Sequence, residues 1–168
     1  YEFLRDMEFN RLLSSAISVY GEPNLKSINE KKDEDEYTNQ INKKNYQLIK
    51  EVNELDKWIN EAEEIGEIAV DTETDSLDPH QANLVGISLC TKIGKACYIP
   101  VGHKFEECLD RKEVLKKIKS LLEDPSIKKI GQNIKFDFII FNKLGINLNS
   151  IEDTMLMSYV LDAGKNRH

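Results

Sequence analysis

The sequence predicts an α/β fold in which a mixed β-sheet is flanked by helices. Three strand-like segments come first and a helix–strand–helix series follows them, an order typical of mixed α/β domains. The chain has 168 residues, of which 40% are hydrophobic and 32% are charged. This size and balance suit one soluble globular domain that also carries a solvated segment.

Residues 1–45 differ in composition from the rest of the chain. Apolar residues at roughly helical spacing predict a short amphipathic helix within residues 1–20, which we interpret as the tail of a preceding domain. Residues 21–45 are rich in Lys, Glu, Asp and Asn, and cannot bury enough apolar surface to offset their ordering entropy. They predict a flexible charged linker, with a binding tail as the alternative. The globular part is therefore residues 46–168.

The first half of the globular part predicts one helix and three strands. Apolar residues at helical spacing predict a helix over residues 54–64, which Gly66 ends. A β-rich run over residues 67–74 predicts a strand that finishes in polar side chains. Two more strands, over residues 83–91 and 95–101, are separated by a short connection, which predicts an antiparallel hairpin.

The second half predicts three helices around a short strand. The helix over residues 111–123 has its apolar side chains on one side, and the strand over residues 127–130 follows it. The next helix covers residues 133–144 and stops at Gly145. The last helix covers residues 153–161. Asp153 stands at its start, where an N-cap is the first interpretation and an approach to a metal site the second.

Composition also narrows the class of protein. No segment approaches the ~18–20 consecutive apolar residues of a bilayer span, so we expect no membrane partner. The net charge of −7 argues against a sequence-independent DNA coat, which usually carries a basic excess. Cys90, Cys97 and Cys108 include no C-x-x-C pair, and three is an odd number. They favour reduced thiols in a cytosolic protein over a disulfide framework.

Two carboxylates lie close together near the end of the first predicted strand. Because side chains alternate along a strand, Asp71 and Glu73 leave the same face, with Cα atoms about 6–7 Å apart. Two carboxylates at this separation repel each other unless a cation lies between them. A metal site is one interpretation of this D-x-E pattern, and a solvated strand end is the other.

Asp137 falls on the apolar side of the predicted helix over residues 133–144. At 100° per residue it lies among Ile134, Ile140, Phe141 and Leu144, so it faces the interior. A buried carboxylate costs several kcal/mol unless it is paired, hydrogen-bonded or metal-bound. The other interpretations are a cap on a neighbouring helix or a pair with Lys. Asn133 shares this face, either as the N-cap of the helix or as a ligand-contacting amide.

Five ordered segments carry a family resemblance: VDTETDSL (70–77), ANLVGIS (82–88), YIPV (98–101), GQNIKFD (131–137) and DTMLMSY (153–159). This series closely resembles the 3′→5′ proofreading exonuclease domain of bacterial DNA polymerase I. That domain is a member of the DEDD exonuclease superfamily, which has an RNase H-like fold. The resemblance covers about residues 46–168. It implies hydrolysis of the 3′-terminal phosphodiester of single-stranded DNA, with release of nucleoside 5′-monophosphates, in replication and repair.

The resemblance implies a role for each acidic residue that matches the family's motifs. Asp71 would bridge two Mg²⁺ or Mn²⁺ ions, and Glu73 would bind the ion that holds the attacking water. Asp137 would serve the other ion. Leu77 matches a residue that packs against the terminal base, with an ordinary core leucine as the alternative. The matched positions near the bound strand are Thr74, Gln132, Asn133 and Phe136, the last standing where well-known members have Tyr.

The resemblance also implies features beyond this chain. The family's third motif, Y-x-x-x-D, supplies the last metal ligand, whereas Tyr159 and Asp162 have the spacing Y-x-x-D. We therefore expect a C-terminally incomplete domain that is inactive alone. We expect it to be a monomer from the bacterial cytoplasm, with 5′-nuclease and polymerase domains in the parent chain. The alternatives are an RNase D-like exoribonuclease and a non-catalytic DNA-holding or structural domain of a polymerase.

Two further groups of residues have an ordinary structural interpretation beside a functional one. Lys128, Lys129 and Lys135 face the DNA backbone in the functional interpretation and form a solvated face in the other. His80 and His103 are expected to be surface residues in loops. No second His or Cys stands at zinc spacing from them, which argues against a zinc site.

Overall fold

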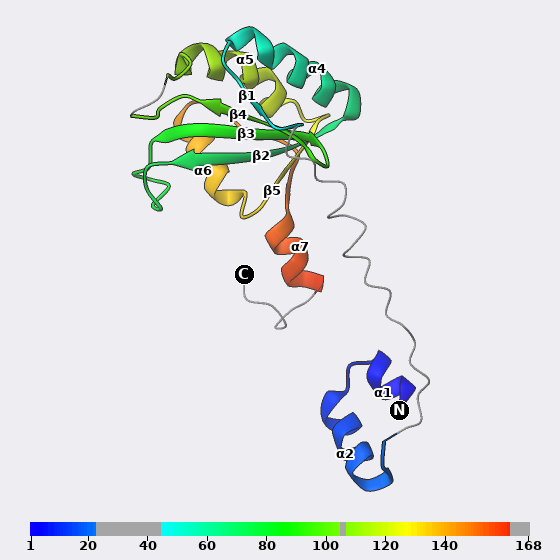
Figure 1. The fold of residues 1–168 in the computed structure, drawn as a ribbon. Helices are drawn as coiled ribbons and strands as arrows, with labels where there is room; N and C mark the ends of the chain where they lie inside the picture. The colour runs from blue at the N-terminus through cyan, green and yellow to red at the C-terminus, as the bar shows by residue number, and fades with distance from the viewer. Residues whose placement is uncertain (23–44, 105–106, 162–168) are drawn as a thin grey trace. The chain divides into compact units, whose positions relative to one another are not determined.

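The computed structural model describes residues 1–22, 45–104 and 107–161 (Figure 1). The chain divides into two compact units, Tyr1–Asp35 and Glu36–His168. The linker predicted for residues 21–45 lies almost wholly outside the described residues. Among the residues that are described, no helix has the length and apolar character to cross a membrane.

The described part of the first unit, residues 1–22, contains two helices where the sequence predicts one. Helix α1 covers Glu2–Asp6 and α2 covers Asn10–Tyr20. The prediction of a continuous helix is wrong because the chain turns at Glu8, whose φ of 55° is left-handed. This turn brings the rings of Phe3 and Phe9 edge to face, with centroids 6.3 Å apart.

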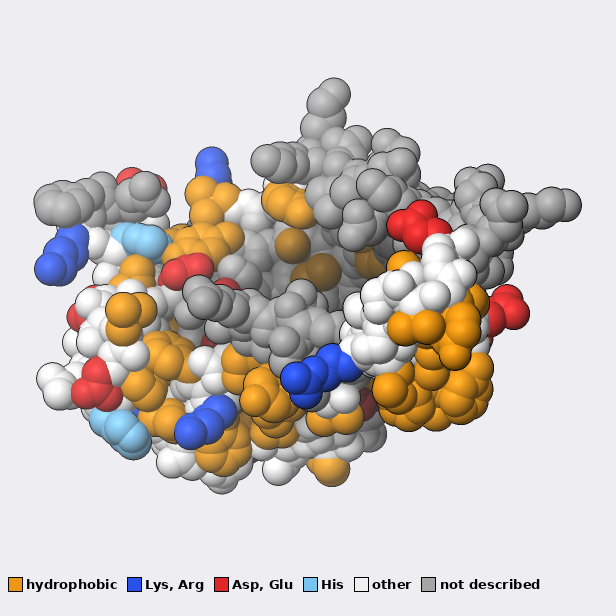
Figure 2. Space-filling model, turned by 90° about the horizontal axis from the view of Figure 1, so that it is seen from below, with side chains coloured by type: hydrophobic (Ala, Val, Ile, Leu, Met, Phe, Trp, Pro, Cys, Tyr) orange, Lys and Arg blue, Asp and Glu red, His pale blue; other side chains and the backbone are white. Residues whose placement is uncertain are grey.

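Figure 2 views the molecule from below and shows hydrophobic side chains reaching the surface on that side, between scattered charged groups.

The second unit is built on a six-stranded sheet in the order β1-β4-β3-β2-β5-β6 (Figure 1). Strands β3 and β4 form the predicted antiparallel hairpin, and β2 pairs antiparallel with the other edge of β3. The other neighbours are parallel. The strands are β1 (Gln47–Leu48), β2 (Glu67–Thr74), β3 (Leu84–Lys92), β4 (Lys95–Pro100), β5 (Lys128–Gly131) and β6 (Ile151–Asp153). The sequence analysis missed β1 and β6, because two or three residues carry no readable alternation.

Within the described part of the second unit, four α-helices accompany this sheet. They are α4 (Leu55–Ile65), α5 (Arg111–Glu123), α6 (Lys135–Lys143) and α7 (Thr154–Leu161), and a 3₁₀ turn, η2 (Val52–Glu54), leads into α4. Helix α4 ends as predicted at Gly66, where φ is 80°. Apolar residues of α4, α5 and α6 form one core with alternate residues of the strands. Along β2, Ile68, Val70 and Thr72 are buried, whereas Asp71 and Glu73 on the other face are exposed.

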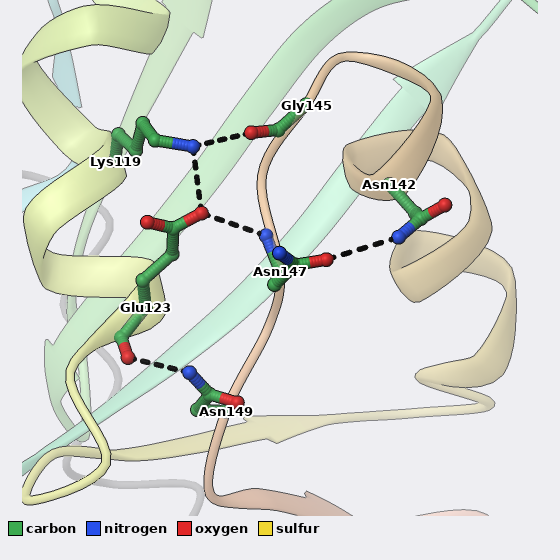
Figure 3. A network of polar contacts seen from close by, with 6 residues as sticks. All are labelled: Lys119, Glu123, Asn142, Gly145, Asn147 and Asn149. Atoms are coloured by element: carbon green, nitrogen blue, oxygen red, sulfur yellow. Dashed lines mark hydrogen bonds and ion pairs between the residues drawn. The ribbon is translucent and has the colours of Figure 1, made fainter.

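A polar network fixes the segment between α6 and β6 against the end of α5 (Figure 3). The Glu123 carboxylate accepts hydrogen bonds from Lys119 Nζ at 2.7 Å and from the Asn147 backbone N–H at 2.9 Å. The Glu123 carbonyl accepts from Asn149 Nδ2 at 2.6 Å. Asn142 of α6 donates through Nδ2 to Asn147 Oδ1 at 3.1 Å. The network therefore ties α6, which carries Asp137, to α5.

Lys129 contradicts its sequence-based interpretation. Its side chain is fully buried, and its Nζ donates to the carbonyl oxygens of Asp124 and Ile127. Lys129 thus stabilises the turn between α5 and β5. Because its side chain is buried, it belongs neither to a solvated face nor to a surface that faces the DNA backbone. Burial lowers the pKa of its ammonium group. Lys128 points elsewhere and pairs with Glu152 of β6 at 3.1 Å.

Candidate active site

The eight residues predicted to form the site line one pocket of about 270 Å³. They come from four places in the fold, namely the end of β2, the loop after it, the turn that leads from β5 into α6, and the first turn of α6. Thr72 also lines this pocket, which we call the carboxylate pocket. Its predicted residues are Asp71, Glu73, Thr74, Leu77, Gln132, Asn133, Phe136 and Asp137.

Asp71 and Glu73 stand on the same face of β2, as the period of two predicts. Asp71 lies opposite Ser88 of β3, and Glu73 lies opposite Gly86. Both carboxylates are exposed. The sheet therefore presents two negative groups, side by side, on the face that the core does not occupy.

Asp137 reaches β2 where its partner strand has ended. The pairing of β5 with β2 runs only from Glu67 to Ala69, so this edge of β2 is free of β5 at Thr72. There Asp137 Oδ1 accepts hydrogen bonds from the Thr72 backbone N–H at 2.8 Å and from Thr72 Oγ1 at 2.6 Å. Asp137 is only 2% exposed, as its place on the apolar side predicts. With the residues that the structure describes, it neither caps a helix nor pairs with Lys, so neither of those interpretations holds there.

The pKa of the Asp137 carboxyl group is raised, and burial is the main cause. The two hydrogen bonds from Thr72 act in the opposite direction, and the negative charge of Asp71 raises the pKa further. The charged form of Asp137 is thus disfavoured by its surroundings. A cation beside it would stabilise that charged form.

Asn133 is not the N-cap that the sequence predicts. Its φ of 54° is left-handed, a conformation that Asn tolerates better than most residues, and α6 begins only at Lys135. The turn before α6 is held instead by Asp153, whose Oδ1 and Oδ2 accept from the N–H groups of Asn133 at 3.0 Å and Ile134 at 3.1 Å. Asp153 Oδ1 also accepts from Met155 N at 2.9 Å, which confirms its predicted cap on α7. The sequence gives no signal for the first of these two roles, because Asp153 lies twenty residues away.

The side chains around the acids differ in exposure. Leu77 is 96% exposed, so its interpretation as a core leucine is wrong. Gln132 and Asn133 are exposed, and Gln132 Oε1 accepts a hydrogen bond from Thr154 Oγ1. Phe136 is half-buried and packs against the core. The rim of the pocket is therefore open and mixed, with one apolar side chain projecting into solvent.

The donor chemistry of the pocket suits a hard cation. Its potential ligands are carboxylates, hydroxyls and amides, and it is lined by no His or Cys. In the described part of the chain, no three His, Cys, Asp or Glu side chains are already arranged as a metal site. The acids line one pocket without being grouped as a metal site, so holding an ion there would require their side chains to rearrange.

The comparison with known families decides the assignment. A family model described as 3′-5′ exonuclease matches residues 46–168. The chain belongs to this 3′-5′ exonuclease family. DNA polymerase I of Rhizobium leguminosarum is 40% identical over 144 residues, and DNA polymerase I of Pseudomonas aeruginosa is 42% identical over 129 residues. The match identifies the exonuclease domain of the DNA polymerase I type. The alignment covers 73% of this chain and 14% of the length of either relative.

Two solved structures share the fold. Escherichia coli RNase D is 23% identical with a TM-score of 0.57, covering 74% of this chain and 31% of that one. Brucella melitensis NrnC with bound Mg²⁺ is 21% identical with a TM-score of 0.52, covering 73% of this chain and 55% of that one. At these identities the likeness concerns the fold alone, and it confirms the predicted RNase H-like class.

Proposed function

We propose that the carboxylate pocket removes nucleotides from the 3′ end of single-stranded DNA with the help of Mg²⁺ or Mn²⁺. The observation that carries this proposal is that buried Asp137 is hydrogen-bonded to Thr72, the residue between Asp71 and Glu73 on β2. All three acids line the same pocket. A structural role alone does not account for a carboxylate whose charged form is disfavoured where it lies.

Asp71, Glu73 and Asp137 would hold the cations. Two divalent ions supply Lewis-acid polarisation of the phosphate, activation of the attacking water and stabilisation of the leaving 3′ oxygen. The chain's own contribution is to fix the acids, since Thr72 holds Asp137 by two hydrogen bonds and the β2–β3 pairing holds the backbone of Asp71 and Glu73.

The rim residues would bind the strand. Exposed Leu77 offers an apolar surface on which the terminal base can pack. Thr74, Gln132 and Asn133 offer polar groups to the sugar and phosphates, and Phe136 has no hydroxyl to add to these contacts. None of these groups forms a base-specific pattern, so we expect removal of nucleotides irrespective of sequence.

We also propose that the chain works within a longer bacterial protein, beside polymerase and 5′-nuclease domains, in DNA replication and repair. The support is its identity to two DNA polymerase I proteins over a small part of their length. The fold likeness to RNase D makes RNA a substrate to be compared directly with DNA.

The test is a Mn²⁺ titration, followed by magnetic resonance of the free ion, combined with hydrolysis of 3′-labelled DNA and RNA strands. We expect Mn²⁺ binding that weakens at least about tenfold in Asp71→Asn and Asp137→Asn. Glu64→Gln is the matched control, because Glu64 is an exposed acid of α4 outside the pocket. Mn²⁺ binding that is equal in wild type and in Asp71→Asn would refute the metal site. Because we expect this chain to be inactive alone, hydrolysis is measured in a longer chain that also contains the Y-x-x-x-D motif. Mn²⁺ binding without release of nucleoside monophosphate from either strand by that longer chain would favour a DNA-holding domain.

A further inference from the structure

A second pocket, of about 330 Å³, adjoins the carboxylate pocket and is lined by basic side chains. His103 and Lys104 follow β4, and Arg111 is the first residue of α5. Thr74 lines the carboxylate pocket and the next residue, Asp75, lines this one. The loop between β2 and β3 and the segment after β4 lie at the same end of the sheet (Figure 1). The loop that follows Thr74 is therefore a wall between the two pockets.

Asp75 is the one acid in the lining of this basic pocket, and its carboxylate is hydrogen-bonded within the loop between β2 and β3. Asp75 Oδ1 accepts from Asn83 N at 2.7 Å, and Oδ2 accepts from Asn83 Nδ2 at 2.9 Å. These hydrogen bonds, and to a smaller extent the charge of Lys104, hold the pKa of Asp75 below its usual range. Asp75 thus braces the loop between β2 and β3, and its two oxygens are already hydrogen-bonded.

The other side of the basic pocket is held firmly. Gly102 lies so close to β3 that a Cβ atom there would stand 2.6 Å from the Leu84 carbonyl oxygen. His103 Nε2 lies 2.7 Å from the Tyr98 hydroxyl, and the His103 backbone N–H donates to Cys108 Sγ at 3.1 Å. His103, expected to be a plain surface residue, is therefore half-buried and fixed. The backbone that carries Lys104 is positioned before any ligand arrives.

Two cations of the basic pocket have no hydrogen bond or ion pair through their side chains among the described residues, although the charge of Lys104 acts on Asp75. Neither Lys104 nor Arg111 makes a hydrogen bond or an ion pair through its side chain with any residue that the structure describes. Among the described residues, Lys112 and Lys116 of α5 also lack an ion pair, but they line neither this pocket nor the carboxylate pocket. In a chain of net charge −7, unpaired cations gathered at one pocket indicate a site for an anion.

We propose that the basic pocket binds a backbone phosphate of the same single strand whose 3′ end lies in the carboxylate pocket. This inference rests on the proposed function and adds a second contact point to it. The Arg111 guanidinium can grip a phosphate with two parallel hydrogen bonds, and Lys104 adds a point charge. Such a contact carries no sequence information. It also has a length requirement, because only a strand that passes the wall can reach it.

The test compares two strand lengths and two variant pairs in the 168-residue chain. Binding is measured by fluorescence anisotropy over a range of salt concentrations, using phosphorothioate-linked oligothymidines of about three and about ten nucleotides. The variant is Lys104→Gln with Arg111→Gln. The matched control is Lys112→Gln with Lys116→Gln, which removes the same charge from exposed positions of α5 outside the pocket.

We expect the pocket variant to weaken binding of the long strand on the order of fivefold at low salt. The slope of log binding constant against log salt concentration should fall in magnitude by about 0.7, the value for one lost phosphate contact on a single strand. Binding of the short strand should be unchanged, and the control pair should leave both strands unaffected. Equal losses in both variant pairs, or an equal loss for both strand lengths, would overturn the inference and leave the proposed function standing. Failure of wild type to bind the short strand would overturn the proposed function, and failure to bind either strand would overturn both.

Discussion

Replacing Asp137 separates its hydrogen bonds from its charge. Asp137→Asn keeps an Oδ1 acceptor for the Thr72 N–H and hydroxyl, whereas Asp137→Ala removes the acceptor and leaves two buried donors unsatisfied. Each such donor costs about 1–3 kcal/mol, so Asp137→Ala should lower the free energy of unfolding by about 2–6 kcal/mol. Asp137→Asn should raise it by about 1 kcal/mol, because burial of the charge outweighs the bonds that the charge receives.

The pH dependence gives this prediction its sign. A carboxyl group whose pKa is raised in the folded state binds more protons there than in the unfolded chain, so its contribution to stability grows as pH falls from above the folded pKa toward the unfolded value. The advantage of Asp137→Asn should therefore shrink as pH falls from about 7 to about 4. Urea denaturation without divalent ions measures both effects. An asparagine variant as unstable as the alanine variant, or a difference from wild type that ignores pH, would contradict the reasoning.

Three other substitutions test the fold. Glu61 has its pKa lowered to about 2, chiefly by Lys95, so Glu61→Gln should cost about 1–2 kcal/mol at neutral pH. That loss should fade as pH drops from about 4.5 to about 2, which acid denaturation of both proteins would reveal. Gly86→Ala would place a Cβ 1.9 Å from the Tyr98 hydroxyl, so it should cost about 1–3 kcal/mol, and less when Tyr98→Ala is also present, as a double-mutant cycle would measure. Lys129→Ala should lower the free energy of unfolding by about 2–4 kcal/mol, because it opens a cavity and leaves two carbonyl oxygens without their donor. Urea denaturation measures this loss, and an unchanged midpoint would contradict the role of Lys129.

The elements that the sequence predicts well are those with a long repeating pattern and a marked end. Helix α5 has the bounds 111–123 in both the prediction and the structure, and α4 ends at Gly66. Prediction failed where the cause is distant or the element is short. Strands β1 and β6 exist because neighbouring strands supply their hydrogen bonds, and no pattern within two or three residues encodes that.

At the site, local pattern and burial located the acids but not their surroundings. The alternation of β2 gives the shared face of Asp71 and Glu73, and the apolar side of α6 gives the burial of Asp137. The Thr72 contact was missed because it depends on β5 stopping before the end of β2. Lys129 was misread because a basic residue is usually solvated, and only the turn after α5 supplies the carbonyl oxygens that bury it.

The carboxylate of Asp153 makes a mechanical joint between two helices. It accepts hydrogen bonds both from the turn that starts α6 and from the first turn of α7. A displacement of α7 would pull on that shared anchor and be transmitted along α6 to Asp137. The start of α7 and the turn before α6, the helix that carries Asp137, thus share one anchoring side chain.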